Sequence, residues 1–253
     1  SNPKSIRHNS VNHVTVSSDN KILLTNYIAF EIFDPETEEF THYVHEPDNP
    51  SSLKRGQTTA VFEDSRKNIW IAGNMGLNLF DKQKGTFKHY STKDGLPNNS
   101  IQGILEDDHQ NLWITTNKGF VKFINGVNTP QQPEFRVYDK DDGVPSNDFI
   151  SRSAHKGSDG FFNLGTSRGF TRFHPDNIKD NDVPPSVIIS DFRLIGSSGN
   201  NSIPMLKSIN INNIENIKLN YKQNNFRIHF TAINYINPKK NRYKFMLKGH
   251  ESD

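Results

Sequence analysis

Short hydrophobic runs, separated by polar and glycine-containing breaks, follow one another along the first two thirds of the chain. Between residues 58 and 90 this pattern predicts four strands, at 58–62, 69–72, 77–80 and 86–90. The break that ends at Gly76 predicts a tight turn, because glycine adopts a positive φ without steric cost. We therefore expect this stretch to form a small antiparallel sheet.

The same pattern is repeated along the chain. Residues 68–80 recur 43 positions later as residues 111–123, with Trp70 matched by Trp113. Weaker copies place the four repeats at about 11–57, 58–100, 101–149 and 150–183. Four antiparallel strands at such a period are the construction of a β-propeller blade. Four blades lie at the lower end of the range that propellers use, so we expect them to be part of a larger propeller.

The repeat stops near Pro184 and Pro185, which predict a stiff linker. Beyond it, alternating apolar residues predict strands at 186–195, 217–221, 226–232 and 243–248, with a long loop over 196–216. Four strands are too few to complete a β-sandwich. We therefore expect an all-β chain with propeller blades at 1–183 and an incomplete immunoglobulin-like sandwich at 184–253. The first residues are neither a signal peptide nor an initiator methionine start, so we expect an excised piece of a longer protein.

Composition narrows the function. The 253 residues carry a net charge of +2 and contain no cysteine. The near-neutral charge gives no electrostatic basis for nucleic-acid binding. Without cysteine, disulfides, thiolate zinc sites and cysteine catalysis are excluded. Neither a nucleophile constellation nor a phosphate-binding glycine loop is apparent, so we predict no catalytic activity, no metal and no cofactor.

Residue types that recur at the same position of different repeats are expected to serve the architecture. Trp70 and Trp113 are expected to pack within blades. The acidic pairs Glu63–Asp64 and Glu106–Asp107 are expected to form hydrogen bonds in turns. His42 and His89 occupy one repeat position, and no metal role is expected for them. Sugar stacking by the tryptophans and catalysis by the paired carboxylates are the alternatives.

Ligand recognition should lie in what the blades do not share. In a propeller, the connectors between blades and the turns between second and third strands occupy one face. The variable polar residues predicted there are Arg55, Asn74, Lys93, Asn98, Asn99, Lys118, Asn147, Asp148 and Arg168. Cationic and amide side chains suit the hydroxyls and carboxylates of an oligosaccharide. The alternative is that they are solvated loop tips.

The repeated Glu-Asp, Asn-x-Trp-Ile, Gly-Leu/Phe and Phe-Asp elements, with Asp94–Asn99 between copies, resemble the regulator-propeller repeats of bacterial hybrid two-component system proteins. The segments 185–194, 219–221, 226–234 and 243–249 resemble the triple-tyrosine immunoglobulin-like domain that follows those propellers. Together the two resemblances cover nearly the whole chain.

The resemblance implies the periplasmic sensor region of an inner-membrane protein, with two seven-bladed propellers, the sandwich, a membrane helix and a histidine kinase core, often followed by a receiver and a DNA-binding module. Such proteins detect oligosaccharides and regulate polysaccharide-utilisation genes, and the parent is expected to be a homodimer. The partners implied for this chain are the oligosaccharide and the rest of its own polypeptide, with no nucleic acid contacted. The alternatives are a propeller-type lyase or hydrolase, which needs convergent acid and base groups, and a protein-interaction propeller.

Overall fold

The computed structural model describes residues 5–138, 142, 148–178, 186–195, 206–209, 217–219, 221, 225–233, 241, 243 and 245. The chain divides into two compact units, Ser1–Lys179 and Asp180–Asp253. The two units are treated separately below. The expected linker at Pro184 and Pro185 lies outside the described residues.

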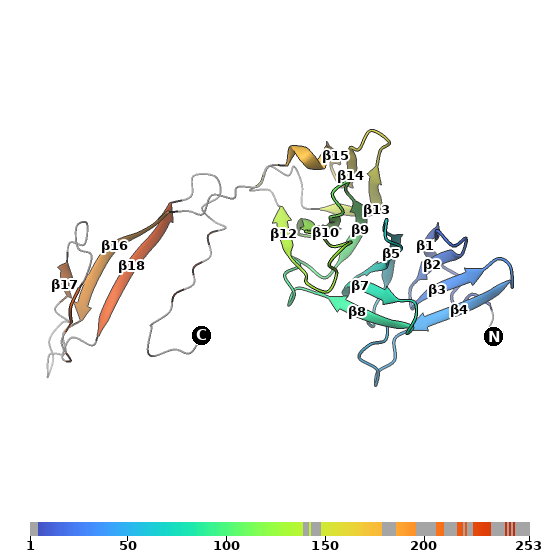
Figure 1. Cartoon of the computed structure of the whole chain (residues 1–253), viewed down its shortest axis with the longest axis horizontal. Helices are drawn as coiled ribbons and strands as arrows, with labels where there is room; N and C mark the ends of the chain where they lie inside the picture. The colour runs from blue at the N-terminus through green and yellow to red at the C-terminus, as the bar shows by residue number, and fades with distance from the viewer. Residues whose placement is uncertain are drawn as a thin grey trace. The chain divides into compact units, whose positions relative to one another are not determined.

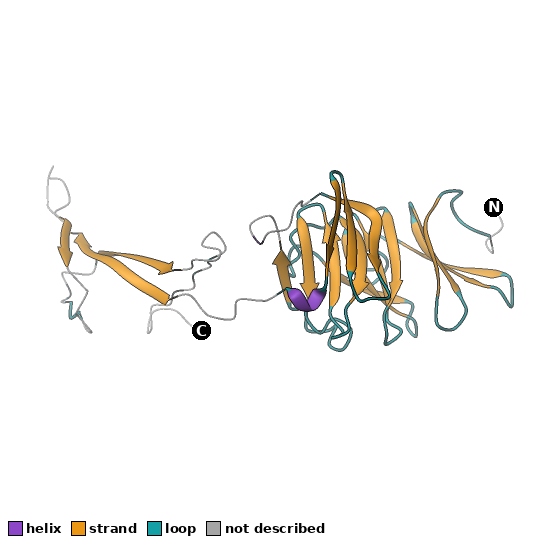
Figure 2. Ribbon diagram, turned by 90° about the horizontal axis from the view of Figure 1, so that it is seen from above, coloured by secondary structure: helices purple, strands orange, loops and turns teal. Residues whose placement is uncertain are grey.

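The first unit consists of four antiparallel sheets, which Figures 1 and 2 show side by side. Strands within each sheet keep their chain order. Blade 1 contains β1 (Val11–Val16), β2 (Ile22–Asn26), β3 (Ala29–Asp34) and β4 (Glu39–Val44); blade 2 contains β5 (Thr58–Glu63), β6 (Ile69–Gly73), β7 (Gly76–Asp81) and β8 (Thr86–Tyr90). Blade 3 contains β9 (Ile101–Glu106), β10 (Leu112–Thr116), β11 (Gly119–Phe123) and β12 (Phe135–Tyr138); blade 4 contains β13 (Phe149–Lys156), β14 (Phe162–Thr166) and β15 (Gly169–Phe173).

The predicted fold class, all-β with propeller blades, is confirmed, and the four strands predicted between residues 58 and 90 are β5 to β8. Blade 4 differs from the expected four-stranded repeat, since three strands form its sheet among the described residues. After β15 the chain enters the short 3₁₀ helix η2 (Pro175–Asn177). Proline is tolerated at the start of a helical turn but cannot donate to a strand ladder, which explains the change at this point.

The first strands of the blades form the inner ring of the unit. β1 packs beside β5, β5 beside β9 and β9 beside β13. Blade 4 also reaches blade 1, because the Arg152 guanidinium donates a hydrogen bond to the carbonyl oxygen of Asn12. This arrangement sends the turns of all four blades to two opposite ends of the strands.

Three hydrophobic cores fill the spaces between consecutive blades. Each contains an aromatic pair at its interface: Phe30 and Phe80 with ring centroids 5.3 Å apart, Trp70 and Phe123 at 5.9 Å, and Trp113 and Phe162 at 6.2 Å. Trp70 is fully buried and Trp113 is 3% exposed. Burying one large side chain of this kind contributes about 1.5 to 3 kcal/mol. The tryptophans therefore have the predicted packing role, but they pack between neighbouring blades and not only within one.

The second unit contains one sheet with the order β17 (Leu206–Ile209), β16 (Ser186–Ile195), β18 (Phe226–Ile233). The predictions of strands at 186–195 and 226–232 are confirmed. Within residues 196–216, which were predicted to be mostly loop, the structure places the short strand β17, which pairs with Phe192–Ile195 of the long strand β16; the other residues of this stretch lie outside the described part of the chain.

The strand predicted at 217–221 is also wrong. Residues 217–219 and 221 are described and are not in a strand. The sheet of this unit is formed instead by β17, β16 and β18. Tyr243 and Tyr221, both on predicted strands, are outside strands too, and the Tyr243 hydroxyl accepts a hydrogen bond from the Ala232 amide at 3.1 Å. The rest of the strand predicted at 243–248, Phe245 excepted, lies outside the described residues.

Candidate functional site

The predicted ligand residues lie at one end of the blades. Asn74, Lys118 and Arg168 occupy the turns β6–β7, β10–β11 and β14–β15, while Arg55, Lys93, Asn98, Asn99 and Asp148 occupy the connectors that enter or leave the inner strands. Asn147 lies outside the described residues. The sequence could locate these residues because the period fixes which turns share an end.

Hydrogen bonds join turns and connectors at this end. The Asn74 amide donates to the Gln57 carbonyl oxygen at 3.0 Å, and the Gly76 amide donates to the Asn99 carbonyl oxygen at 2.8 Å. In blade 4 the Ser167 amide donates to the Asp148 carbonyl oxygen at 3.3 Å. The predicted residues are thus brought together in small groups, each within one blade or between two neighbours. We call this end of the blades the connector face.

Two of the predicted residues are engaged in local structure. The side-chain oxygen of Asn98 accepts a hydrogen bond from the Ser100 amide at 2.7 Å, and that of Asn99 accepts one from the Thr92 amide at 2.8 Å. Both side chains therefore fix the connector between blades 2 and 3. Their remaining amide hydrogens are the groups that could reach a ligand.

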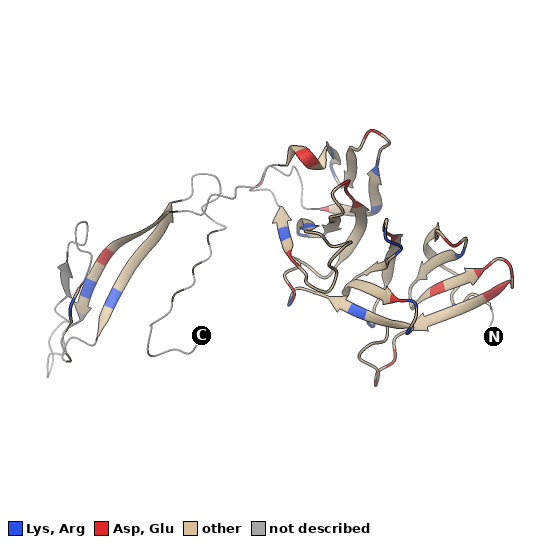
Figure 3. Ribbon diagram, viewed as in Figure 1, with Lys and Arg blue, Asp and Glu red and all other residues tan. Residues whose placement is uncertain are grey.

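The cations of the connector face are exposed. Within the described part of the chain, Arg55, Lys93, Lys118 and Arg168 have no carboxylate within ion-pair distance, whereas Lys21, Lys82, Lys84, Lys156 and Arg172 of the same unit each form an ion pair. Charges of both signs are distributed over the whole first unit (Figure 3). The connector face thus presents four cations with free donors beside the acidic residue Asp148.

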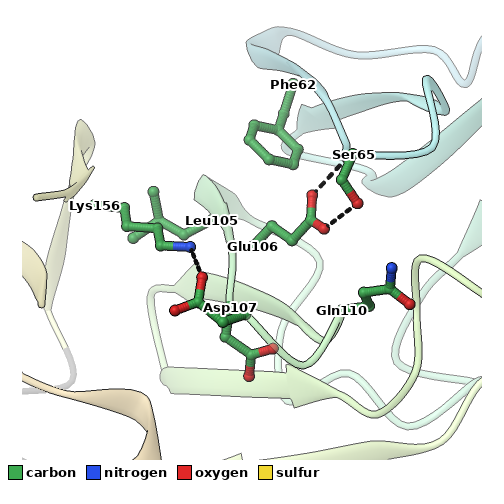
Figure 4. Close-up of a pocket in the computed structure, with 8 residues that line it drawn as sticks. Phe62, Ser65, Leu105, Glu106, Asp107, Gln110 and Lys156 are labelled. Atoms are coloured by element: carbon green, nitrogen blue, oxygen red, sulfur yellow. Dashed lines mark hydrogen bonds and ion pairs between the residues drawn. The ribbon is translucent and has the colours of Figure 1, made fainter. Parts of the chain in front are cut away.

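A cavity of about 450 Å³ lies at the opposite end of the blades, lined by Phe62, Ser65, Leu105, Glu106, Asp107, Asp108, Gln110 and Lys156 (Figure 4). We call this end the turn face, because it holds the turns that follow the inner strands. The sequence did not predict this cavity, because Glu106 and Asp107 recur between repeats and were expected only to stabilise turns. No sequence signal marks the depression between blades that they surround.

The polar groups of the cavity are already engaged with one another. The Glu106 carboxylate accepts hydrogen bonds from the Ser65 amide at 2.8 Å and from the Ser65 hydroxyl. Glu63 binds Ser18 of blade 1 in the same way, at 2.6 Å and 3.2 Å. The equivalent pair between blades 3 and 4 is Asp108 and Lys156, with Nζ to Oδ1 at 2.7 Å. We call these three contacts the blade latches.

The third latch reverses the chemistry of the first two. Its acidic member stands on the turn and its basic member on the inner strand, while the others join a serine on the turn to a glutamate on the strand. The hydrogen bond from Lys156 and its positive charge hold the pKa of the Asp108 carboxyl below its usual value. Blade 4 is therefore matched electrostatically to blade 3.

Asp64 and Asp107 organise the turns beside the latches. Each carboxylate accepts hydrogen bonds from two turn amides, from the side chain of Asn68 or Asn111, and from the tryptophan indole N–H at 2.8 Å. The prediction that these acidic residues serve turn hydrogen bonding is confirmed. With all acceptor positions used, neither carboxylate is placed to act as a general acid or base.

The two matched histidines bond to the neighbouring strand. His42 Nδ1 lies 2.7 Å from Glu31, and His89 Nδ1 lies 2.7 Å from the side-chain oxygen of Asn78. Among the residues that the structure describes, no three His, Asp or Glu side chains are grouped so that they could hold a metal ion. In the same residues, no helix has the length and apolar character needed to cross a bilayer.

Comparisons with known proteins match these features. Residues 95–118 match the family model described as two component regulator propeller. The chain is 30% identical over 161 residues to histidine kinase P4 of Formosa agariphila, an alignment that covers 62% of this chain and 11% of that protein. The chain thus spans about a tenth of the length of the curated relative that it matches.

Solved structures with the same fold come from Bacteroides thetaiotaomicron. The extracellular domain of BT3049, assigned to the hybrid two component systems, has a TM-score of 0.68 and 23% identity over 90% of this chain and 30% of its own. The extracellular domain of BT4673, likewise assigned, has a TM-score of 0.59 and 22% identity over 76% of this chain and 27% of its own. The resemblance to two-component regulator propellers is therefore confirmed: one stretch of this chain matches their family model, and the chain has the fold of the extracellular domains of hybrid two-component systems.

Proposed function

We propose that this chain is part of the extracytoplasmic sensor region of a hybrid two-component histidine kinase and is itself non-catalytic. The observation that carries the proposal is the similarity over 161 residues to a histidine kinase, within the fold of extracellular two-component domains. The engagement of Asp64 and Asp107 in turn hydrogen bonds supports a binding role over hydrolysis or elimination. Signal output then requires the remainder of the polypeptide, which we propose to be a membrane-anchored homodimer with its sensor in the periplasm.

The ligand that we propose is an oligosaccharide, bound at the connector face. Exposed guanidinium and ammonium groups at Arg55, Lys93, Lys118 and Arg168 suit hydroxyls and, better, the carboxylates of uronic acids. Asn74 is exposed at the tip of its turn and adds an amide that donates and accepts. The response of the protein to such a ligand would be the regulation of polysaccharide-utilisation genes.

Calorimetry on the intact sensor region, titrated with matched neutral and uronic oligosaccharides, tests the proposal. We expect saturable binding of a uronic oligosaccharide that weakens at least tenfold in a variant with Arg55→Ala and Lys118→Ala. Lys84→Ala is the control, since Lys84 is also exposed but lies on a turn at the other end of blade 2. The proposal fails if a folded sensor region binds no glycan, or if the control variant loses binding to the same extent.

A further inference from the structure

The inner strands of the blades share an irregularity near the connector face. In β1, β5 and β9 the pairing with the second strand skips one residue, and the skipped residues are Asn12, Thr59 and Gln102. Each of them is the second residue of its strand. An extra residue of this kind is a β-bulge, which bends the strand and re-aims a side chain. The bulges therefore give each of these blades one polar residue at the connector end of the inner ring.

The irregularity is larger in blade 4, and there it contains a cation. Phe149 pairs with Thr166 and Ala154 with Leu164, so residues 150–153 of β13 stand opposite a single residue of β14. Within this bulge Arg152 has a φ of +62°, a left-handed conformation that long side chains seldom adopt. Strained backbone of this kind is found most often at functional sites. The bulge of blade 4 is therefore the one to examine for a function.

Hydrogen bonds link the bulges from blade to blade. The Asn12 side-chain amide donates to the Thr58 carbonyl oxygen at 2.7 Å, and the Thr59 hydroxyl donates to the Ile101 carbonyl oxygen at 2.8 Å. The Arg152 guanidinium donates to the carbonyl oxygen of Asn12, so this bond joins blade 4 to blade 1. The four bulges thus lie around the connector end of the inner strands. We define the bulge ring as the residues Asn12, Thr59, Gln102 and Arg152.

The charge of Arg152 is not neutralised within the described part of the chain. Arg152 is exposed, and its partner there is a neutral carbonyl oxygen, with no carboxylate within ion-pair distance. Burial, and then the positive charge of Arg152, lower the pKa of His13 on β1 below its usual value, so this charge acts across the ring. A guanidinium carries five N–H donors in a planar fork, and most of them remain available here. Such a group is suited to a carboxylate, which it binds through two parallel hydrogen bonds.

We propose that the bulge ring binds the carboxylate of the ligand and that Arg152 determines the preference for uronic acids over neutral sugars. This inference rests on the function proposed above, and it assigns the selection of charge to an inner strand instead of a turn or connector. The guanidinium exchanges its bond to the Asn12 carbonyl oxygen for two bonds to the carboxylate, because a charged acceptor forms the stronger hydrogen bond. Binding of an acidic ligand then also releases the contact between blades 1 and 4.

The replacement Arg152→Gly tests this assignment without adding strain, because glycine adopts a positive φ freely. Calorimetry on the intact sensor region compares a uronic oligosaccharide with the same oligosaccharide after reduction of its carboxylates to hydroxymethyl groups. We expect the parent to prefer the acidic ligand, and Arg152→Gly to reduce this preference about tenfold to a hundredfold by weakening the binding of the acidic ligand alone. Arg152→Lys keeps the charge but not the planar fork, so its loss should be smaller.

Lys67→Gly is the matched control, because Lys67 is also an exposed cation with a positive φ, of +66°, but lies between β5 and β6 on the turn face. It should leave both affinities unchanged. Equal losses for the acidic and the neutral ligand in Arg152→Gly would show a purely structural role and overturn the proposal. An unchanged affinity for the acidic ligand would also overturn it and leave the proposed function standing. A folded parent that binds no glycan would instead refute the proposed function, and this inference with it.

Discussion

The replacement Asp107→Asn examines the turn on which each blade depends. Asp107 is 3% exposed, and both of its carboxylate oxygens accept hydrogen bonds. One oxygen faces the amides of His109 and Asn111 at 2.9 Å, and the other faces the Asn111 side-chain amide and the Trp113 indole at 2.8 Å. Asparagine keeps the shape but replaces one acceptor by a donor, so two N–H groups must face an amide NH₂.

The size of the effect follows from these contacts. Each buried donor left without an acceptor costs about 1 to 3 kcal/mol, and the bonds lost here were to a charged acceptor. Two such donors give a loss of roughly 2 to 5 kcal/mol in the free energy of unfolding. For a unit of this size that corresponds to a fall in Tm of roughly 4 to 20 °C. Trp113 also loses the bond that orients its ring against Phe162 and Tyr138.

Urea unfolding followed by tryptophan fluorescence measures this loss. Asp108→Asn is the matched control, because it is the adjacent residue, its side chain is 71% exposed and it makes one solvent-screened ion pair, so its effect on stability should be small beside that of Asp107→Asn. Combining Asp107→Asn with Trp113→Phe, which removes one of the stranded donors, should cost less than the sum of the single changes. The reasoning is refuted if Asp107→Asn and Asp108→Asn unfold at the same urea concentration.

Three other predictions concern the blades. Lys156→Glu places two carboxylates in the third latch and should lower the Tm by up to a few degrees, and salt should reduce this loss. Adding Asp108→Ser to the same chain should restore the Tm, because it rebuilds a serine–glutamate latch like that of Ser65 and Glu106. A Tm unaffected by either change would contradict the role of the latch. Burial, with a contribution from the charge of Lys54, lowers the pKa of His89 below its usual 6.5, so the folded state favours the neutral ring. The contribution of His89 to stability is therefore complete above pH 6.5 and is lost as the pH falls. The free energy of unfolding plotted against pH should have a shallower slope in His89→Asn, and an unchanged slope would show that His89 does not contribute to the pH dependence. Gly76→Ala meets both a φ of +109° and the Tyr90 carbonyl oxygen 2.2 Å from the new Cβ, whereas Gly169→Ala meets a φ of +131° with no atom within 4 Å. Urea unfolding should therefore show a larger loss of unfolding free energy for Gly76→Ala, by about 1 kcal/mol or more beyond the shared backbone strain, and equal losses would rule out the clash.

Repetition explains why the first unit could be anticipated from its sequence. Trp70 and Trp113 recur with their aspartates and asparagines because blades 2 and 3 have the same hydrogen-bonded turn, and a residue type that recurs at the blade period reports structure. The same logic located the connector face. It failed where blades differ, since nothing in the sequence of blade 4 alone shows that η2 replaces a fourth strand.

The second unit has no period, and there the local pattern was a weaker guide. Residues 217–221 alternate as a strand should, but sheet pairing depends on contacts made elsewhere in the chain, and the long strand β16 pairs instead with β17 and β18. The cavity on the turn face was missed for a related reason. Glu106 and Lys156 lie in different blades 50 residues apart, and only the packing of inner strands brings their neighbourhood together.

The central claim, that the connector face belongs to a signal-input module, is tested most directly on the full-length protein in membranes. Autophosphorylation is measured with and without a uronic oligosaccharide that calorimetry shows to bind. The account predicts that the ligand changes the rate severalfold in the parent protein and that the combined variant Arg55→Ala, Lys118→Ala no longer responds, while Lys84→Ala responds as the parent does. A phosphorylation response that persists unchanged in the combined variant would contradict it.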